Sequence, residues 1–198
     1  MDIRDKNKYF DLRSPKLYAS EYFYQILESS KMVDLSDLEE IIKVIRDAEK
    51  NKNKIYSIGN GGSESISQHF ITDFTKGTNN KNFKIKTFNL SSNSSMITAL
   101  GNDFGFNQIY SKQIEYYCSE GDILLSISSS GNSANIIDAI KAAKSLGIKT
   151  ISFTGFSGGE VKNISDLNLH VPFDNYGIVE DMHQSFMHII AQYLFKNS

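Results

Sequence analysis

Cysteine and proline are nearly missing from this sequence of 198 residues. It contains one cysteine, Cys118, and two prolines, Pro15 and Pro172. A single cysteine excludes an intramolecular disulfide and any metal site built from several thiolates. No stretch rich in proline, glycine and serine divides the chain, so we expect one domain spanning residues 1–198.

The sequence also lacks an excess of either charge and any long apolar run. Its 21 basic and 23 acidic residues give a formal net charge of −2, whereas general nucleic-acid binders usually present a basic face. No apolar run approaches the roughly 20 residues that a membrane span needs, and the first residues lack the apolar segment of a secretory signal. We therefore expect a cytoplasmic protein without nucleic-acid or membrane partners.

The first fifty residues show helical periodicity without an intervening strand. Apolar residues recur at helical spacing from 17 to 33. A second periodic segment follows Ser36, and Glu39 three residues later completes the pattern of a capping box. Two successive helices predict an N-terminal helical arm over residues 15–51, used for self-association.

After residue 54, short apolar runs alternate with helical patterns. Such alternation predicts βαβ units and a mostly parallel sheet covered on both faces. The expected fold is α/β, a flavodoxin-like three-layer sandwich with a five-stranded parallel sheet. The expected strands are Ile55–Ile58, Phe83–Phe88, Ile123–Ile127, Lys149–Phe153 and Leu167–Val171, with helices near 64–76, 92–100, 107–118, 133–146 and 178–195.

Two small-residue loops each lead from an expected strand into an expected helix. The first is Gly59-Asn60-Gly61-Gly62-Ser63-Glu64-Ser65, and the second is Ser128-Ser129-Ser130-Gly131-Asn132-Ser133. Glycines permit close approach of a ligand, helix N-termini present free N–H groups to anions, and serines add neutral donors. Two such loops at one edge of a sheet favour a phosphate site, although each alone is also typical of a tight turn with a serine cap.

Neither loop is a nucleotide-binding fingerprint. Glu64 stands where a G-x-G-x-x-G motif would need its last glycine, and no G-x-x-x-x-G-K-[ST] motif occurs. A third loop at 154–159 follows the fourth expected strand but has no comparable group of serines.

Titratable residues recur on two of the expected helices. His69 and Asp73 are four residues apart and share a helix face. Glu180 and His188 are eight apart, about 80° around a helix axis. If the last helix lies over the first loop, these four side chains converge. They would then suit Zn²⁺ with open coordination positions, or acid/base pairs without any metal.

Simpler interpretations compete for individual histidines. A His–Asp pair at this spacing is often only a surface pair. His170 ends an expected strand and is expected to make a local hydrogen bond, and His183 suits helix packing.

Several segments, taken in order, resemble a known family. The sequence is similar to the SIS sugar-phosphate isomerase domain and, within it, to the phosphoheptose isomerase branch, from about residue 15 to 195. The matching segments are Gly59-Asn60-Gly61-Gly62-Ser63, Gln68-His69-Phe70, Leu100-Gly101-Asn102-Asp103-Phe104-Gly105-Phe106, Ile127-Ser128-Ser129-Ser130-Gly131-Asn132-Ser133 and the terminal helix with His183 and His188.

The resemblance implies a cytoplasmic homotetramer that converts sedoheptulose 7-phosphate to D-glycero-D-manno-heptose 7-phosphate for lipopolysaccharide or capsule synthesis. It implies His188 as a catalytic histidine and His69 as a ligand of one Zn²⁺ per subunit, and we extend the ligand set to His69, Asp73, Glu180 and His188. The expected substrate-binding residues are Asn60, Gly61, Gly62, Ser63, Asp103, Ser128, Ser129, Ser130, Ser133 and Glu180.

Three positions depart from the family pattern. Asp73 replaces the glutamate that usually acts as base, Glu180 replaces a glutamine, and Gly177 replaces an aspartate. We expect Asp73 or Glu180 to move the proton between carbons through an enediol, with His188 as acid/base partner. The alternatives are an isomerase of a related sugar phosphate and a non-catalytic SIS module that binds or senses sugar phosphates.

Overall fold

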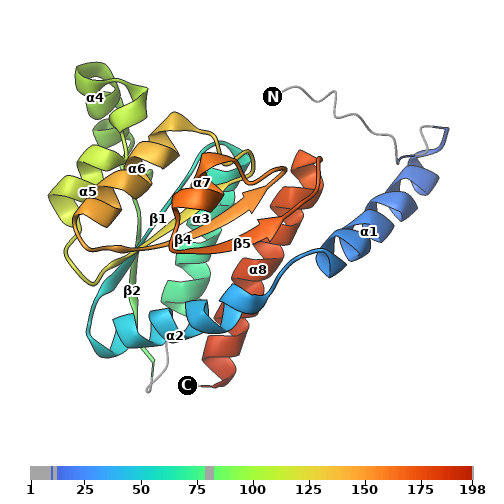
Figure 1. The fold of residues 1–198 in the computed structure, drawn as a ribbon, viewed down its shortest axis with the longest axis horizontal. Helices are drawn as coiled ribbons and strands as arrows, with labels where there is room; N and C mark the ends of the chain where they lie inside the picture. Colours follow the sequence, from blue (N-terminus) through green and yellow to red (C-terminus); the bar gives the residue numbers. More distant parts are fainter. Residues whose placement is uncertain (1–9, 11–12, 79–82, 198) are drawn as a thin grey trace.

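The computed structural model describes residues 10, 13–78 and 83–197. Its five strands form one parallel sheet in the order β2-β1-β3-β4-β5 (Figure 1). The strands are β1 Lys54–Gly59, β2 Lys86–Asn89, β3 Ile123–Ser128, β4 Lys149–Gly155 and β5 Leu167–Val171. The helices are α1 Pro15–Lys31, α2 Ser36–Lys50, α3 Gly62–Thr72, α4 Ser94–Phe104, α5 Ser111–Tyr117, α6 Ala134–Ser145, α7 Gly159–Ile164 and α8 Tyr176–Lys196.

The sheet lies between two layers of helices, as the apolar runs predict. All six residues of β3 are buried, which is typical of a central parallel strand covered on both faces. One apolar cluster joins the sheet to α2, α3 and α8, and the second joins it to α4, α5, α6 and α7. The α/β three-layer fold and the two N-terminal helices are confirmed. None of the described helices is both long and apolar enough to cross a bilayer.

Helix boundaries differ from the sequence predictions in three places. Ser36 is the first residue of α2 and not its cap, because Asp34 Oδ1 accepts a hydrogen bond from the Ser36 backbone N–H at 2.9 Å. The helix expected at 107–118 divides into a 3₁₀ turn, Phe106–Gln108, and α5. Helix α7 was not predicted, since it has only six residues.

The end of α3 widens into a π-helical turn, Asp73–Gly77. Such turns are rare and often occur at functional sites, because they change the direction in which side chains leave the helix. Here the wide turn begins at Asp73, one of the expected catalytic residues.

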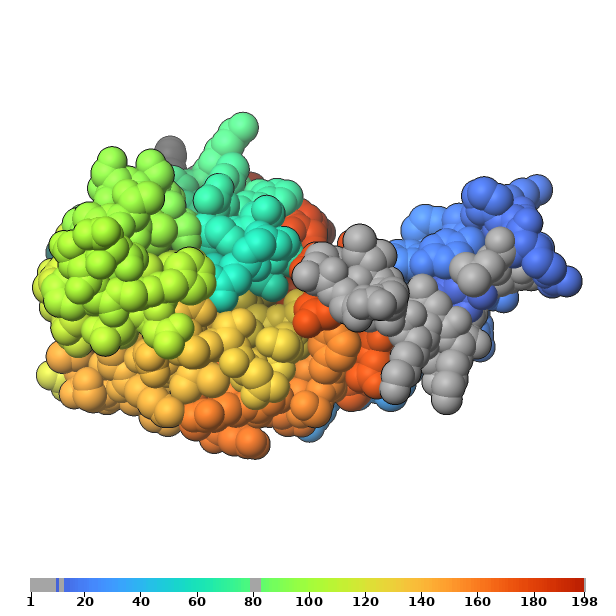
Figure 2. All heavy atoms as spheres, turned by 90° about the horizontal axis from the view of Figure 1, so that it is seen from above, coloured from blue at the N-terminus to red at the C-terminus, as the bar shows by residue number. Residues whose placement is uncertain are grey.

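Helix α1 extends away from the body of the fold, whereas α2 packs along it (Figures 1 and 2). One face of α1 contacts α8 and adds Tyr18, Tyr22 and Ile26 to the apolar core. The other face leaves Phe23 71% and Leu27 55% exposed. A helix with apolar side chains on both faces needs a second partner for its exposed face.

Two histidines outside the site have the structural roles expected of them. His170 Nδ1 lies 3.2 Å from the Thr154 hydroxyl. His183 is buried on α8 between Phe153 and Phe186. Burial lowers the pKa of His183 to about 4, although the Thr154 backbone partly offsets this effect.

We expect the stability of the fold to fall as the pH falls from about 6.5 to 4. In this window the unfolded chain binds a proton at His183 that the folded chain excludes, because the ordinary histidine pKa is about 6.5. The loss amounts to an order of 3 kcal/mol. Urea titrations across this range, compared with a His183→Leu variant, measure it. An identical pH slope in both proteins would contradict the assignment.

Candidate active site

A pocket of about 260 Å³ opens at the carboxyl ends of β1 and β3. Both small-residue loops and the start of α8 form its walls, as expected for ligand sites in doubly wound sheets. Its lining residues are Asn60, Gly61, Gly62, Ser63, Ile127, Ser128, Ser129, Ser130, Ser133, Tyr176 and Glu180. Every expected substrate-binding residue except Asp103 therefore lies at this pocket.

Hydrogen bonds join the two loops to each other and to the helix behind them. The Ser63 and Ser129 hydroxyls lie 3.4 Å apart. Asn60 and Asn135 exchange two side-chain hydrogen bonds of 2.9 Å, which connect the first loop to the first turn of α6. The sequence analysis missed Asn135, and its only signal was its position just after the second loop.

The third loop, 154–159, supports the second loop from behind. The Gly155 N–H donates to the Ser129 carbonyl, and the Val161 N–H donates to the Gly131 carbonyl, each at 2.9 Å. Gly131 has φ +64°, and a Cβ placed on it would lie 1.9 Å from the Gly158 carbonyl oxygen. Close contact between two glycine-containing backbones therefore fixes the shape of the serine loop.

Glu180 reaches the pocket because Gly62 has no side chain. A Cβ on Gly62 would lie 2.5 Å from the nearer Glu180 carboxylate oxygen. Burial, and to a lesser extent the neighbouring Asp181 carboxylate, raises the pKa of Glu180. A carboxyl group of raised pKa is a better proton donor near neutrality and repels a bound phosphate less than an ordinary glutamate would.

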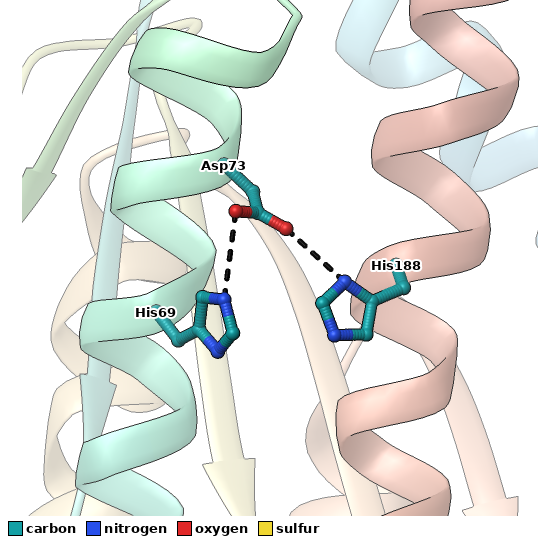
Figure 3. Close-up of side chains that lie close together, drawn as sticks. All are labelled: His69, Asp73 and His188. Carbon is teal, nitrogen blue, oxygen red and sulfur yellow. Dashed lines mark hydrogen bonds and ion pairs between the residues drawn. The ribbon is translucent and has the colours of Figure 1, made fainter.

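Three side chains from α3 and α8 form a separate cluster (Figure 3). His69 Nε2 lies 3.5 Å from Asp73 Oδ1, and His188 Nδ1 lies 3.1 Å from Asp73 Oδ2. The histidine rings stand edge to face with centroids 5.2 Å apart. Asp73, although one methylene shorter than glutamate, therefore contacts both imidazoles, and the predicted convergence of these three residues is confirmed.

The expected fourth member, Glu180, lies elsewhere. Among the described residues, the group of potential ligand atoms within 4.8 Å of one another consists of His69, Asp73 and His188. Eight residues of helix place Glu180 and His188 about 12 Å apart along the axis, although their angular positions are similar. Glu180 thus belongs to the loop pocket in this structure, and the four-residue ligand set is not assembled.

Gln184, which the sequence analysis missed, contacts both histidines of the cluster. Its Nε2 lies 2.8 Å from His69 Nδ1 and 3.1 Å from His188 Nε2. An amide nitrogen only donates, so these ring nitrogens accept, and the nitrogens facing Asp73 carry the protons. The hydrogen-bond network therefore makes His188 a donor to the Asp73 carboxylate, whereas His69 Nε2 faces the other carboxylate oxygen at 3.5 Å. The available sequence signal was the position of Gln184, one helical turn before His188.

Asp103 lies outside the pocket. It is exposed on α4, where Asn102 Nδ2 donates to its carboxylate at 2.9 Å. Its assignment to the sugar hydroxyls stays a prediction.

The pocket and the cluster lie at two levels along the contact between α3 and α8. The helices meet first at Gly62 and Glu180, and again where His69 and Asp73 face His188. Seven or eight residues of helical rise separate the two levels, roughly 10–12 Å. This arrangement can hold an anionic group at one end and carry out acid/base chemistry at the other.

Comparisons with known proteins agree with this geometry. A model of the SIS domain family matches residues 20–155. The phosphoheptose isomerase of Aliarcobacter butzleri is 40% identical over 155 residues, which cover 78% of this chain and 82% of that protein.

Two solved structures resemble this one closely. A phosphoheptose isomerase from Francisella tularensis has a TM-score of 0.81 at 31% identity, covering 90% of this chain and 95% of that chain. The phosphoheptose isomerase of Neisseria gonorrhoeae has a TM-score of 0.81 at 30% identity, covering 89% and 94%. The serine-lined pocket, the His–Asp–His cluster and these matches together place the chain in the phosphoheptose isomerase family of SIS domains.

Proposed function

We propose that the protein is an aldose–ketose isomerase that converts sedoheptulose 7-phosphate to D-glycero-D-manno-heptose 7-phosphate. The observation that carries the proposal is the two-level arrangement along α3 and α8, with neutral phosphate donors at one level and the Asp73 cluster at the other. Their separation of roughly 10–12 Å along the helices is about the span of an extended seven-carbon sugar phosphate. Cytoplasmic synthesis of heptose for lipopolysaccharide or capsule is the setting that the family resemblance suggests.

The chemistry requires a proton to move between adjacent carbons through an enediol. Asp73 is the carbon base, because its carboxylate lies at the level of the α3–α8 contact away from the phosphate pocket. His188, which donates to Asp73 through Nδ1, exchanges the hydroxyl proton. The backbone and hydroxyl groups of the pocket hold the phosphate and orient the sugar. Glu180, beside that pocket, donates a hydrogen bond to the bound anion when protonated.

The activity is tested by NMR with sedoheptulose 7-phosphate in D₂O. An aldose phosphate carrying deuterium at the adjacent carbon supports an enediol isomerase. Binding of the sugar phosphate without product or deuterium exchange would instead favour the non-catalytic module, and turnover of another sugar phosphate alone would identify a related isomerase.

The cluster also fits a divalent metal. Two imidazoles and one carboxylate within 4.8 Å form a donor set suited to Zn²⁺ with an open coordination position. His69 Nε2 and His188 Nδ1 are the ring nitrogens that would bind the ion, because the opposite nitrogens face Gln184. Those opposite nitrogens would then carry the protons, and the Gln184 amide would have to present its Oε1 to them as the acceptor. A zinc ion bound there would polarise the sugar carbonyl.

Replacing Gln184 with leucine should weaken Zn²⁺ binding by about 10–100-fold. The substitution removes the one amide that orients both histidines, and losses of this size are typical when a group supporting metal ligands is removed. Calorimetric titration with Zn²⁺ measures the change. Ser185→Ala, which alters only a hydroxyl bonded within its own helix, is the matched control. An unchanged Zn²⁺ affinity in the leucine variant would show that Gln184 does not support the site.

We further infer that the helical arm, residues 15–51, joins copies of the chain into a homo-oligomer, and the family resemblance suggests a tetramer. The exposed apolar face of α1 supports this inference. A Phe23→Asp, Leu27→Asp variant should elute with the mass of a single 22.3 kDa chain in light-scattering chromatography. Tyr116→Asp, which charges an equally exposed position on α5, should leave the wild-type mass unchanged. An unchanged mass in the α1 variant would contradict the assignment.

A further inference from the structure

Tyr22 of α1 contacts α8 at a position where the helix has no side chain. A Cβ placed on Gly177 would lie 2.7 Å from the Tyr22 hydroxyl oxygen. The tyrosine hydroxyl therefore occupies space that a side chain at position 177 would otherwise fill.

The same hydroxyl makes a hydrogen bond to α8. Tyr22 Oη donates to Asp181 Oδ2 at 2.8 Å. Burial, and then the Asp181 carboxylate, raises the pKa of Tyr22, so the hydroxyl keeps its proton and remains a donor across the physiological range. The ring is held in place by packing against Phe10, at a centroid distance of 6.0 Å, and by the apolar core.

These contacts bracket the part of α8 that forms the pocket wall. Tyr176 and Glu180 line the pocket, and each is adjacent in sequence to one of the two contact residues, Gly177 and Asp181. On the opposite side, Glu180 packs against Gly62 of the first loop. The first turns of α8 therefore lie between α1 and the first loop. The Tyr22 hydroxyl holds them on one side, and the absence of side chains at Gly177 and Gly62 allows the close contacts on both sides.

We propose that Tyr22 is a positioning residue of the sugar-phosphate pocket, which fixes the first turns of α8 through Asp181 and the space above Gly177. Its effect reaches the substrate through Glu180 and Tyr176, so Tyr22 should control binding more than the chemical step. The inference rests on the proposed isomerase activity only for its kinetic readout, because phosphate binding can be measured without turnover.

A double-mutant comparison tests the coupling. Tyr22→Phe removes only the hydroxyl and should raise both the KM for sedoheptulose 7-phosphate and the Kd for inorganic phosphate by about 3–10-fold, with kcat within about twofold of the wild type. Gly177→Ala in the wild-type background should weaken phosphate binding by more than about tenfold. In the Tyr22→Phe background, the same alanine should cost less than about threefold, because the atom that it meets is gone.

Controls separate positioning from general damage. Tyr193→Phe removes a hydroxyl from an exposed tyrosine near the end of α8 and should behave as the wild type. Asp181→Asn retains an acceptor oxygen and should largely preserve phosphate affinity. Thermal unfolding and chromatographic mass are measured for every variant, since α1 is also the proposed association surface.

Two results would overturn the proposal. One is a Tyr22→Phe protein with unchanged KM and phosphate Kd. The other is an equal effect of Gly177→Ala in both backgrounds, which would mean that the hydroxyl does not occupy the space above Gly177. If the wild type binds phosphate but shows no isomerase activity, the proposed function fails, while the phosphate Kd values still decide the role of Tyr22.

Discussion

Asp73→Asn should lower kcat for sedoheptulose 7-phosphate by about 10²–10⁴-fold, the usual contribution of a general base. Asparagine keeps the size of the side chain and one acceptor oxygen, so the hydrogen bond from His188 can persist. The carbon-bound proton, however, then has no carboxylate to accept it. Initial-rate assays and the rate of deuterium exchange from D₂O measure the loss, which should appear with little change in phosphate affinity.

The matched comparison is Glu180→Gln, because it removes the charge of the other candidate base. Glu180 lines the pocket proposed for the phosphate, about 12 Å along α8 from His188. Neutralising Glu180 should therefore alter the KM for sedoheptulose 7-phosphate. Above the pH at which wild-type Glu180 ionises, the Glu180→Gln variant should bind the phosphate group more tightly than the wild type does. The opposite pattern, with kcat abolished in Glu180→Gln and retained in Asp73→Asn, would assign the carbon base to Glu180.

Gly131→Ala should disrupt the serine loop and lower the melting temperature by roughly 5–15 °C. The new Cβ would lie 1.9 Å from the Gly158 carbonyl oxygen, so one of two closely packed backbones has to move. We expect a cost of about 2–4 kcal/mol, and each kcal/mol corresponds to about 2–4 °C in a chain of this size. Phosphate affinity should fall by more than about tenfold, because Ser128 and Ser130 belong to the displaced loop.

Gly61→Ala separates steric overlap from backbone strain. Gly61 also has a positive φ, +56°, but a Cβ on it would meet no atom within 4 Å. Its ψ of −122° places it in a region that is largely restricted to glycine, so its alanine variant should lose only the roughly 1–3 kcal/mol of that backbone strain. Calorimetric melting curves of the two variants make the comparison. Equal destabilisation would contradict the role assigned to the contact between Gly131 and Gly158.

The sequence predicts four of the strands well because they are short apolar runs that end at a turn. The exception is β2, Lys86–Asn89, which begins three residues after the start of the expected strand Phe83–Phe88. The sequence also predicts the pocket, since parallel strands bring their carboxyl ends to one edge of the sheet. The grouping of Glu180 with His188 failed for a physical reason. The angle around a helix was considered without the rise along it, and eight residues cover about 12 Å.

Other features of the site depend on tertiary geometry that no local pattern records. The amide of Gln184 is not titratable, so no sequence pattern singles it out. Its role follows only from the packing of α3 against α8. The contact between Tyr22 and Gly177 requires the direction of α1, which periodicity does not give. The supporting role of loop 154–159 depends on two backbones meeting behind the serines.

Among the residues that the structure describes, no lysine or arginine lines the pocket that is proposed to hold a phosphate. Long-range attraction between charges raises the rate of encounter and is screened by salt, whereas hydrogen bonds from hydroxyl and backbone groups act only at contact. Capture of an anionic substrate by this protein should therefore proceed at an ordinary, unsteered rate and change little with ionic strength. The enzyme would then work at the same efficiency in dilute and in salt-rich surroundings.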